Sequence, residues 1–435
     1  MKWVVAVLLV LGFSFVIGSD LLAYAMYSLL TLMAASLWLS KNWSAQLSAT
    51  RECSQLKAEI DDHVGIELEV TNRGKLPVPW ILLEDVLSKK AFEHSPPSLE
   101  LQSSRIKLTM LRANQSKKLQ YHFKCNRRGF YQLGPIVLET GDLFGLHRRF
   151  QIKSKPQYLT VYPRVVPIDG YELSSRRPIG EIKMTHRLFE DPTRIAGVRA
   201  YQEGDPLNRI HWRATARTGK LQSKIYESST VAGLTVVLDF HEKAFPRQHE
   251  PIRSELAVTA AVSVANTVQL LGHQVGLLTN GRDAAERMRR QGWDVELGNR
   301  QQAQQAGAML TDNDRLKPLQ VPTQRSSEQF YRIQELLARI EFSDGLEFGP
   351  LLLEAQSRIP RDATVLAIIS KQNPQSTIAL ENMVRQGFAV SAMINVFEPT
   401  EYAQVSGPLI AAGIATYHLR DNDSIIHICR KQILR

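Results

Sequence analysis

Residues 234–243 read LTVVLDFHEK, and this stretch decides the fold of the C-terminal half of the chain. Its first five residues form an apolar and β-branched run, which is typical of a strand covered on both faces. A helix is expected from about Ser254 to Leu271, because small and branched apolar residues recur on one face and Gly272 follows as a stop signal. The next strand is expected at Val275–Thr279.

The same alternation of strands and helices continues to the end of the chain. Strands are expected at 364–369, 389–396 and 415–418, and helices at 328–340, 347–358 and 377–386, with a final helix after the last strand. Such alternation predicts a mainly parallel sheet with helices on both faces, a doubly wound α/β domain. We place this domain at residues 231–435.

A different pattern occupies residues 62–165. Short runs in which apolar and polar residues alternate lie at 64–70, 106–110, 119–123 and 136–138, separated by turn-forming residues. Alternation with a period of two predicts half-buried strands, and about 100 residues suit a small antiparallel β-sandwich.

The first 40 residues are strongly apolar. Two uncharged runs, Trp3–Gly18 and Leu21–Leu39, are separated by Ser19 and Asp20. As helices they span about 24 and 28 Å, close to the roughly 30 Å of a bilayer core. We expect a transmembrane helical hairpin at 1–40 and a juxtamembrane linker at 41–61.

The charges that flank the apolar segment indicate its orientation. Lys2 precedes it, and Lys41, Arg51 and Lys57 follow it. Since positive residues favour the cytoplasmic side, both ends and the soluble domains are expected in the cytoplasm. Two alternatives remain: a single span after a re-entrant piece, which would place the soluble part outside, and a cleaved signal peptide.

Residues 166–230 contain the most distinctive motif of the chain, a linker with one helix. Asp205 is a typical N-cap, Pro206 a typical first helical residue, and Gly219 a typical stop. A helix of about 13 residues is therefore expected between Asp205 and Gly219.

Arginines recur along this expected helix at Arg209, Arg213 and Arg217, a spacing that forms one basic stripe, and Trp212 lies beside them. Two interpretations are open. The stripe pairs with local carboxylates such as Glu203 and fastens one domain to the next, or it anchors an acidic partner, since Arg and Trp dominate interface hot spots.

The string from Arg199 to Gly219, RAYQEGDPLNRIHWRATARTG, resembles the signature of the bacterial domain of unknown function 58 family. RGFYQLGP at 128–135 and DLFGL at 142–146 are similar to the second signature of that family. The resemblance implies a protein of the bacterial cytoplasmic (inner) membrane with a von Willebrand factor A-like domain. It also implies an association with MoxR-type AAA+ ATPases and other envelope proteins, and no established enzymatic activity. The candidate partner-binding residues are Arg199, Tyr201, Asp205, Arg209, Trp212, Arg213 and Arg217.

Within the A-like domain, Asp239 marks the position of a degenerate metal site. Metal-binding A domains carry Asp-x-Ser-x-Ser after the first strand, which supplies hard oxygen ligands. Here only Asp239 of that motif is retained, with His241 and Lys243 in place of the serines. The loop after Ile369 has no carboxylate either. We expect no metal and no cofactor, with Glu242 as the one compensating ligand that could rescue a weak site.

Composition and charge exclude several classes of protein. The chain has 435 residues, 44% hydrophobic and 22% charged, which is ordinary for a folded protein. Ten of the Lys and Arg residues fall in 101–150 against two acidic residues, so a basic surface is expected that could meet anionic lipid, nucleic acid or an acidic protein. The three cysteines show no metal-ligand spacing and are expected to be inert thiols.

No sequence motif for catalysis is present: there is no Walker A loop, HExxH or Gly-x-Ser-x-Gly. We therefore expect an interaction protein rather than an enzyme, a membrane-tethered scaffold that docks a cytoplasmic partner and does not bind nucleic acid. The rival hypotheses are a metal-dependent ligand receptor, an enzyme with a pocket near Asp239, and a DNA-binding protein.

Overall fold

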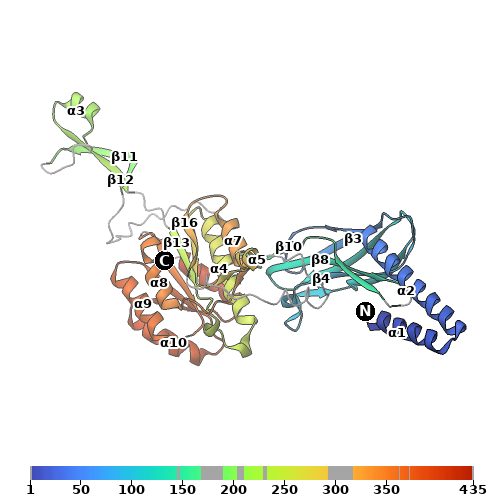
Figure 1. Ribbon diagram of the computed structural model, residues 1–435. Helices are drawn as coiled ribbons and strands as arrows, with labels where there is room; N and C mark the ends of the chain where they lie inside the picture. Colours follow the sequence, from blue (N-terminus) through green and yellow to red (C-terminus); the bar gives the residue numbers. More distant parts are fainter. Residues whose placement is uncertain are drawn as a thin grey trace. The chain divides into compact units, whose positions relative to one another are not determined.

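The computed structural model describes residues 2–143, 145, 147–167, 190–202, 210–228, 233–291, 317–361, 363–371 and 373–433. It is a mixed α/β structure that divides into two compact units (Figure 1). The first unit comprises residues 1–164, 283–313 and 334–341, and the second comprises 165–282, 314–333 and 342–435.

The first unit begins with two apolar helices, α1 (Lys2–Ile17) and α2 (Asp20–Gln46), which lie side by side (Figure 1). Among the described helices, α2 alone is long and apolar enough to cross a membrane, judged by length and composition. It continues past the expected end at Leu39, and β1 (Leu47–Cys53) follows it directly. The linker expected at 41–61 is therefore wrong, because this segment forms the end of α2 and the first two strands.

Two sheets make up most of the first unit after α2; α5 (Ala284–Gln291), β17 (Ile340–Glu341) and the end of α7 (Gln329–Arg339) also belong to it. One has the order β1-β3-β7-β5, with β3 at His63–Asn72, β7 at Ser116–Cys125 and β5 at Leu99–Leu101. The other has the order β2-β10-β8-β4-β6, with β9 paired to β8. Its strands are β2 (Lys57–Glu59), β10 (Gln157–Tyr162), β8 (Gly129–Gly141), β4 (Val78–Leu87), β6 (Ile106–Leu111) and β9 (Arg148–Ile152).

Both sheets contribute to one hydrophobic core, in which Ile66 and Phe123 come from the first sheet and Leu83 and Leu138 from the second. This agrees with the two-layer β architecture expected from the alternating pattern, although one pair, β2 with β10, is parallel. In β6 the apolar residues at 106, 108 and 110 are exposed, whereas Leu111 is buried.

Burial accounts for the state of two thiols in this unit. Burial raises the pKa of Cys53 to about 11 and that of Cys125 to about 12. Because the thiolate is the nucleophile, both groups are protonated and poorly reactive at neutral pH. The side chain of Cys429 lies outside the described residues.

The second unit is built on a six-stranded sheet of order β16-β14-β13-β18-β19-β20, parallel except for the edge strand β16. The strands are β13 (Gly233–Leu238), β14 (Gln274–Thr279), β16 (Leu319–Gln324), β18 (Ala363–Ile369), β19 (Val390–Ile394) and β20 (Ala415–His418). The continuous apolar run at 234–238 is indeed the central strand, buried on both faces.

The helices after β13 are α4 (Ile252–Leu270), α5 (Ala284–Gln291), α7 (Gln329–Arg339), α8 (Phe348–Ala355), α9 (Pro374–Arg385), α10 (Pro399–Ala411) and α11 (Asn422–Ile433). Short 3-10 turns lie at 89–92, 242–244, 247–249 and 356–358, and β15 (Arg282–Asp283) pairs with β17 (Ile340–Glu341). Sequence analysis missed α10, whose interior Pro408 obscures the helical pattern, and β16, which lies in a polar stretch.

Candidate functional site

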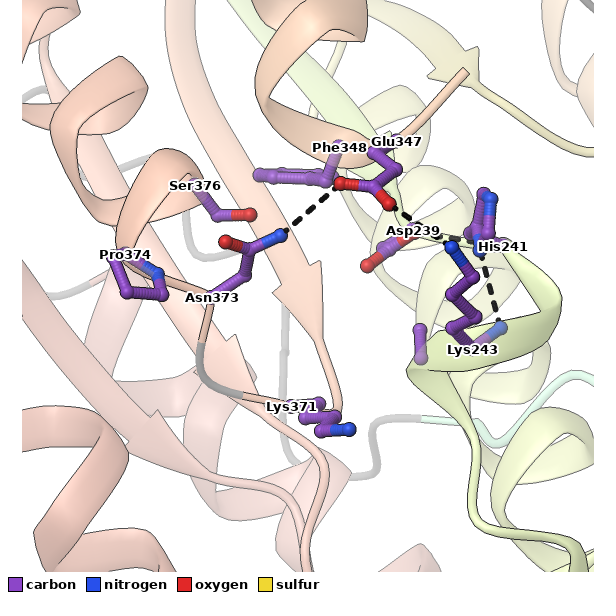
Figure 2. Close-up of a pocket in the computed structure, with 10 residues that line it drawn as sticks. Asp239, His241, Lys243, Glu347, Phe348, Lys371, Asn373, Pro374 and Ser376 are labelled. Carbon is purple, nitrogen blue, oxygen red and sulfur yellow. Dashed lines mark hydrogen bonds and ion pairs between the residues drawn. The ribbon is translucent and has the colours of Figure 1, made fainter. Parts of the chain in front are cut away.

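The carboxyl ends of β13 and β18 form the first candidate site. β13 and β18 are neighbours in the sheet. The chain leaves β13 toward β14 on one side and leaves β18 toward β19 on the other, so the strand order reverses between them. Ligands of doubly wound sheets bind in the crevice at this point. A cavity of ≈ 200 Å³ lies there, and Asp239 from the end of β13 and Lys371 from the loop after β18 both line it (Figure 2).

One carboxylate oxygen of Asp239 is fixed by hydrogen bonds. Its Oδ1 accepts hydrogen bonds from Asn280 Nδ2 at 2.9 Å and from the backbone N–H of His241 at 3.2 Å. The side chain is buried, and this burial raises the pKa of the Asp239 carboxyl. Figure 2 shows the carboxylate directed toward the space bounded by Asn373 and Ser376.

Asn280, at the end of β14, fixes the neighbouring loops around this carboxylate. Its Oδ1 accepts from the backbone N–H of Phe240 at 2.6 Å, and its Nδ2 also donates to the carbonyl of Leu346 at 3.0 Å. The asparagine therefore ties the end of β13 to the loop that delivers Glu347, the N-cap residue of α8.

The charges that line the cavity are mixed. Lys243 Nζ lies 3.4 Å from Glu347 Oε1, and Asn373 Nδ2 lies 3.5 Å from Glu347 Oε2. Lys371 is exposed and has no ion-pair partner among the described residues. The cavity thus combines two carboxylates with two ammonium groups, which suits a small polar or charged group from a ligand or partner.

The donor set fits a divalent cation poorly. An ammonium group next to Glu347 opposes a second positive charge, and the described residues contain no cluster of three or more His, Cys, Asp or Glu side chains suited to a metal. His241 is also engaged, since its Nδ1 accepts from the backbone N–H of Lys243 at 3.1 Å. That the site takes no metal remains a prediction, with this electrostatic basis.

The signature segment forms a small lobe in which β11 (Glu190–Ala200) pairs with β12 (Gln222–Ser228) and α3 (Trp212–Thr218) lies between them in the chain. Of the helix expected between Asp205 and Gly219, the described residues confirm the C-terminal part and its stop at Gly219. α3 begins after His211, whose Nδ1 accepts from the N–H of Ala214, and it ends at Gly219 with φ +65°. Ile210, just before it, is buried and bridged to Ser223 rather than helical, and residues 203–209, where the expected helix would begin, lie outside the described residues.

The partner-binding candidates fall into three groups. Trp212, Arg213 and Arg217 are exposed on α3, and Trp212 is 69% exposed. Arg199 lies in β11 opposite Ser223, and Tyr201 donates its backbone N–H to the carbonyl of Leu221 at 3.0 Å. Asp205 and Arg209 lie outside the described residues, so the stripe is observed only as the pair on α3.

Comparison with known proteins gives a family for part of the chain. Residues 197–293 match the family described as "Protein of unknown function DUF58". This match confirms the resemblance drawn from the Arg199–Gly219 string, over less than a quarter of the chain. It covers the last residues of β11, then α3, β12, β13 and α4, and thus includes Asp239 and Asn280.

The uncharacterized protein YeaD of Bacillus subtilis (strain 168) is 25% identical over 240 residues, which are 54% of this chain and 56% of YeaD. The alignment therefore spans little more than half of that relative. Among solved structures, the CARDB domain of PF1109 from Pyrococcus furiosus aligns with 26% of this chain and 91% of its own length, at 12% identity and a TM-score of 0.19. Proximal thread matrix protein 1 from the mussel byssus covers 47% of each chain, at 11% identity and a TM-score of 0.29. Neither score supports an argument.

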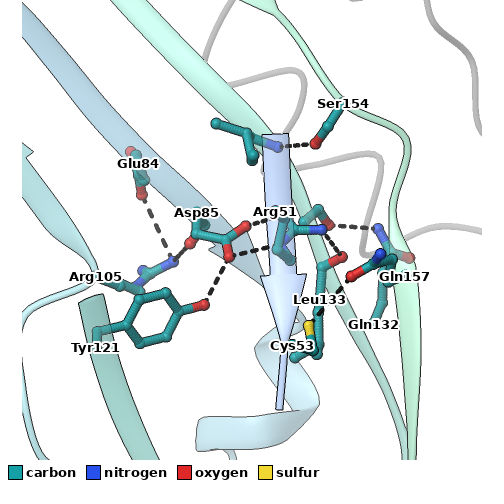
Figure 3. Close-up of polar contacts among 12 residues, drawn as sticks. Arg51, Cys53, Glu84, Asp85, Arg105, Tyr121, Gln132, Leu133, Ser154 and Gln157 are labelled. Atoms are coloured by element: carbon teal, nitrogen blue, oxygen red, sulfur yellow. Dashed lines mark hydrogen bonds and ion pairs between the residues drawn. The ribbon is translucent and has the colours of Figure 1, made fainter. Parts of the chain in front are cut away.

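A second polar cluster is buried in the first unit (Figure 3). Arg51 pairs with Asp85, and both side chains are almost fully buried. Arg51 Nε donates to Asp85 Oδ2 at 2.9 Å, Arg51 Nη1 donates to the carbonyl of Leu133 at 2.9 Å, and Tyr121 Oη donates to Asp85 Oδ2 at 2.7 Å. The guanidinium occupies the space a side chain would take at Gly134. This cluster has a structural role, because it joins β1, β4, β7 and β8.

Sequence reasoning found Asp239 but missed Glu347, Asn280 and Asn373. Two weak signals were available. Asn373 precedes Pro374, a typical helix start, and Asn280 precedes Gly281 in a turn after a strand. Neither signal shows that these residues meet Asp239, since that depends on the order of the strands.

The raised pKa of Asp239 gives the first prediction. The folded state holds a proton on this carboxyl more tightly than the unfolded chain, so its contribution to stability is complete below the unfolded pKa of 3.8 and is lost as the pH rises through the folded pKa. Asp239→Asn should match the wild type at about pH 4 and be more stable than it at about pH 7. Urea unfolding of the full chain in detergent measures this difference.

Asp421→Asn is the matched control, since the hydroxyl and backbone N–H of Ser424 lower the pKa of Asp421. That variant should differ from the wild type in the opposite direction and lose relative stability as the pH rises. Parallel pH profiles for the wild type and Asp239→Asn would contradict the assignment of Asp239.

The buried ion pair gives the second prediction. Asp85→Ala leaves the Arg51 guanidinium buried without its counter-charge and should lower the free energy of unfolding by about 3–5 kcal/mol. Glu67→Ala, which removes the half-buried partner of the exposed Lys118, should leave the urea midpoint almost unchanged. Equal effects of the two substitutions would show that the buried pair is not a structural anchor.

Proposed function

We propose that this protein is a membrane-anchored interaction protein without catalytic activity. In this proposal α1 and α2 form a transmembrane hairpin in the bacterial inner membrane, with both ends in the cytoplasm. The support is the length and apolar composition of α2, together with the exposure of side chains such as Leu21 and Tyr24, which no described part of the chain covers. Lys2 and Lys41 flank the pair on one side.

We further propose that residues 231–435 act as a von Willebrand factor A-like domain. The support is the doubly wound parallel sheet with its central first strand, and the position of Asp239 at the switch in strand order. Lysines beside that carboxylate favour recognition of a partner group without a bridging metal ion.

The exposed surface of α3 carries the docking proposal. No residue of this helix is buried, and Trp212 stands beside Arg213 and Arg217. Large aromatic and guanidinium groups left open to solvent are the groups that dominate interface energetics. The partner is an acidic protein surface, and the family resemblance suggests a MoxR-type AAA+ ATPase.

A metal-dependent ligand receptor is the second candidate, because Asp239 and Glu347 face one cavity. Titration of the full chain with Mg²⁺ in a calorimeter separates the two: a saturable isotherm that is lost in Asp239→Asn would favour the receptor. No heat of binding would favour metal-free docking.

Arg213→Glu tests the docking role. The substitution should abolish crosslinking of the anchored protein to the co-expressed ATPase, because it reverses a charge at the contact. The melting temperature should stay nearly unchanged, because Arg213 is exposed and has no ion-pair partner among the described residues. Arg361→Glu, an exposed charge reversal far along the chain, is the control and should crosslink like the wild type.

A large loss of melting temperature in Arg213→Glu would instead favour the interpretation that the arginine fastens the lobe. Retained crosslinking would refute α3 as the docking surface.

Single cysteines test the orientation. A cysteine at Ser19, between the two helices, should react with a membrane-impermeant maleimide added to spheroplasts, whereas one at Glu59 should react only after lysis. The reverse pattern would place the soluble units outside, as a single-span arrangement predicts.

A further inference from the structure

One face of α2 packs against the β-strands of the first unit and is buried there. The buried side chains Met33, Ser36, Ser40, Trp43 and Ser44 recur every three or four residues. Ser36 Oγ donates to Asp142 Oδ2 at 2.5 Å, and Trp43 is part of the core shared by the two sheets. The second half of α2 is therefore fixed to the β-strands, while its first half is largely unburied.

The two helices indicate where the bilayer ends. α1 has 16 residues and spans about 24 Å. α2 runs back beside it from Asp20 and reaches the same level after about 16 residues, near Ser36. Trp38 lies less than one helical turn beyond Ser36, and its side chain is 61% exposed. Aromatic side chains favour this position, at the interface between membrane and water.

Ser36 also fixes the position of Asp142, the residue that follows β8, at the same height along α2. Besides Ser36, Asp142 accepts the backbone N–H of His147 at 2.9 Å, and its carbonyl accepts Trp80 Nε1 at 3.1 Å. With Asp142 turned inward and buried, the next residue, Leu143, points outward and is 72% exposed. An apolar tip is thus fixed beside the helix at the depth where lipid begins.

The neighbouring strands bring further apolar and basic groups to the same end of the sheet. Across β9, β8, β4 and β6, the paired residues are Arg149, Thr140, Ile81 and Thr109. Met110 follows Thr109 as Gly141 follows Thr140, so Met110 lies in the row next to Asp142. The Met110 side chain is 68% exposed. Exposed cationic groups surround this row: Arg112 after β6, Lys117 in β7 and Arg148 in β9.

The acidic groups here are neutralised. Asp142 is buried among its donors, and Glu139 lies 3.7 Å from Arg148. The basic surplus of residues 101–150 is therefore concentrated in part on a surface that also carries apolar tips. A purely polar anion such as nucleic acid would not favour the exposed Leu143 and Met110.

We propose that this surface, defined by Met110, Arg112, Leu143 and Arg148, binds the anionic phospholipid surface beside the anchor. The leucine and methionine enter the interface, and the arginines pair with phosphate groups of acidic lipids, whose attraction acts within about 8–10 Å of the membrane. The proposal rests on the transmembrane role of α1 and α2, and it adds a second contact that sets the tilt of the first unit on the membrane.

The test uses the full chain in nanodiscs of phosphatidylcholine, or of equal phosphatidylcholine and phosphatidylglycerol. Leu143→Cys carries an environment-sensitive fluorophore, with the unsubstituted chain as the labelling blank. The emission should shift to the blue, more strongly in the anionic discs, and spin-labelled lipids should quench it. The same fluorophore on Glu59→Cys, at the opposite end of the second sheet, should show neither effect.

A matched pair of variants tests the charges. Arg112→Gln with Arg148→Gln should reduce the anionic-disc signal at position 143 to that of the neutral discs. Lys57→Gln with Lys124→Gln, which removes two positive charges at the far end, should leave it unchanged.

The outcomes are distinguishable. Failure of the chain to enter discs would refute the anchor and this proposal together. Incorporation without a spectral response at position 143 would refute this proposal alone. Salt-dependent binding of a labelled DNA duplex, lost in the Arg112 and Arg148 variant and without a lipid response, would also overturn it in favour of nucleic acid.

Discussion

The direct connection between α2 and β1, without a linker residue, is the constraint on which the first unit depends. α2 ends at Gln46 and β1 begins at Leu47, so the apolar helix and the first strand form one continuous element. Ser36 and Trp43 then attach the helix sideways to the β-strands. If α2 crosses a membrane as we propose, this rigid joint fixes the orientation of the sheets, which a flexible linker would not do.

The buried pair of Arg51 and Asp85 extends this constraint into the core. Arg51 lies in β1, directly after the helix, and its guanidinium reaches β4 and β8. A buried ion pair contributes little net stability but strongly penalises arrangements that separate its members. It therefore specifies how β1, the strand that follows α2, is placed in the sheet.

The second unit is a doubly wound sheet with carboxylates and ammonium groups together in the cavity at the carboxyl ends of its central strands. Asp239 lies directly after the central strand β13, and the ammonium group of Lys243 lies 3.4 Å from Glu347 in the same cavity. The lobe with Trp212 adds an exposed aromatic and cationic surface. The two protein-docking surfaces and the lipid surface that we propose would together suit a protein that holds others at the membrane.

Much of the fold follows from local pattern. Three elements were predictable: the strand at 234–238, α4 and the apolar N-terminal helices. A segment covered by apolar surroundings needs apolar residues, and this need is visible in its composition. The tertiary structure alone decided what is brought together. Strand order placed Glu347 and Asn280 beside Asp239, and the fold paired Ile210 with Ser223, so that α3 begins only at Trp212 among the described residues. These contacts join residues remote in sequence, and neither residue type nor spacing reports which strands become neighbours.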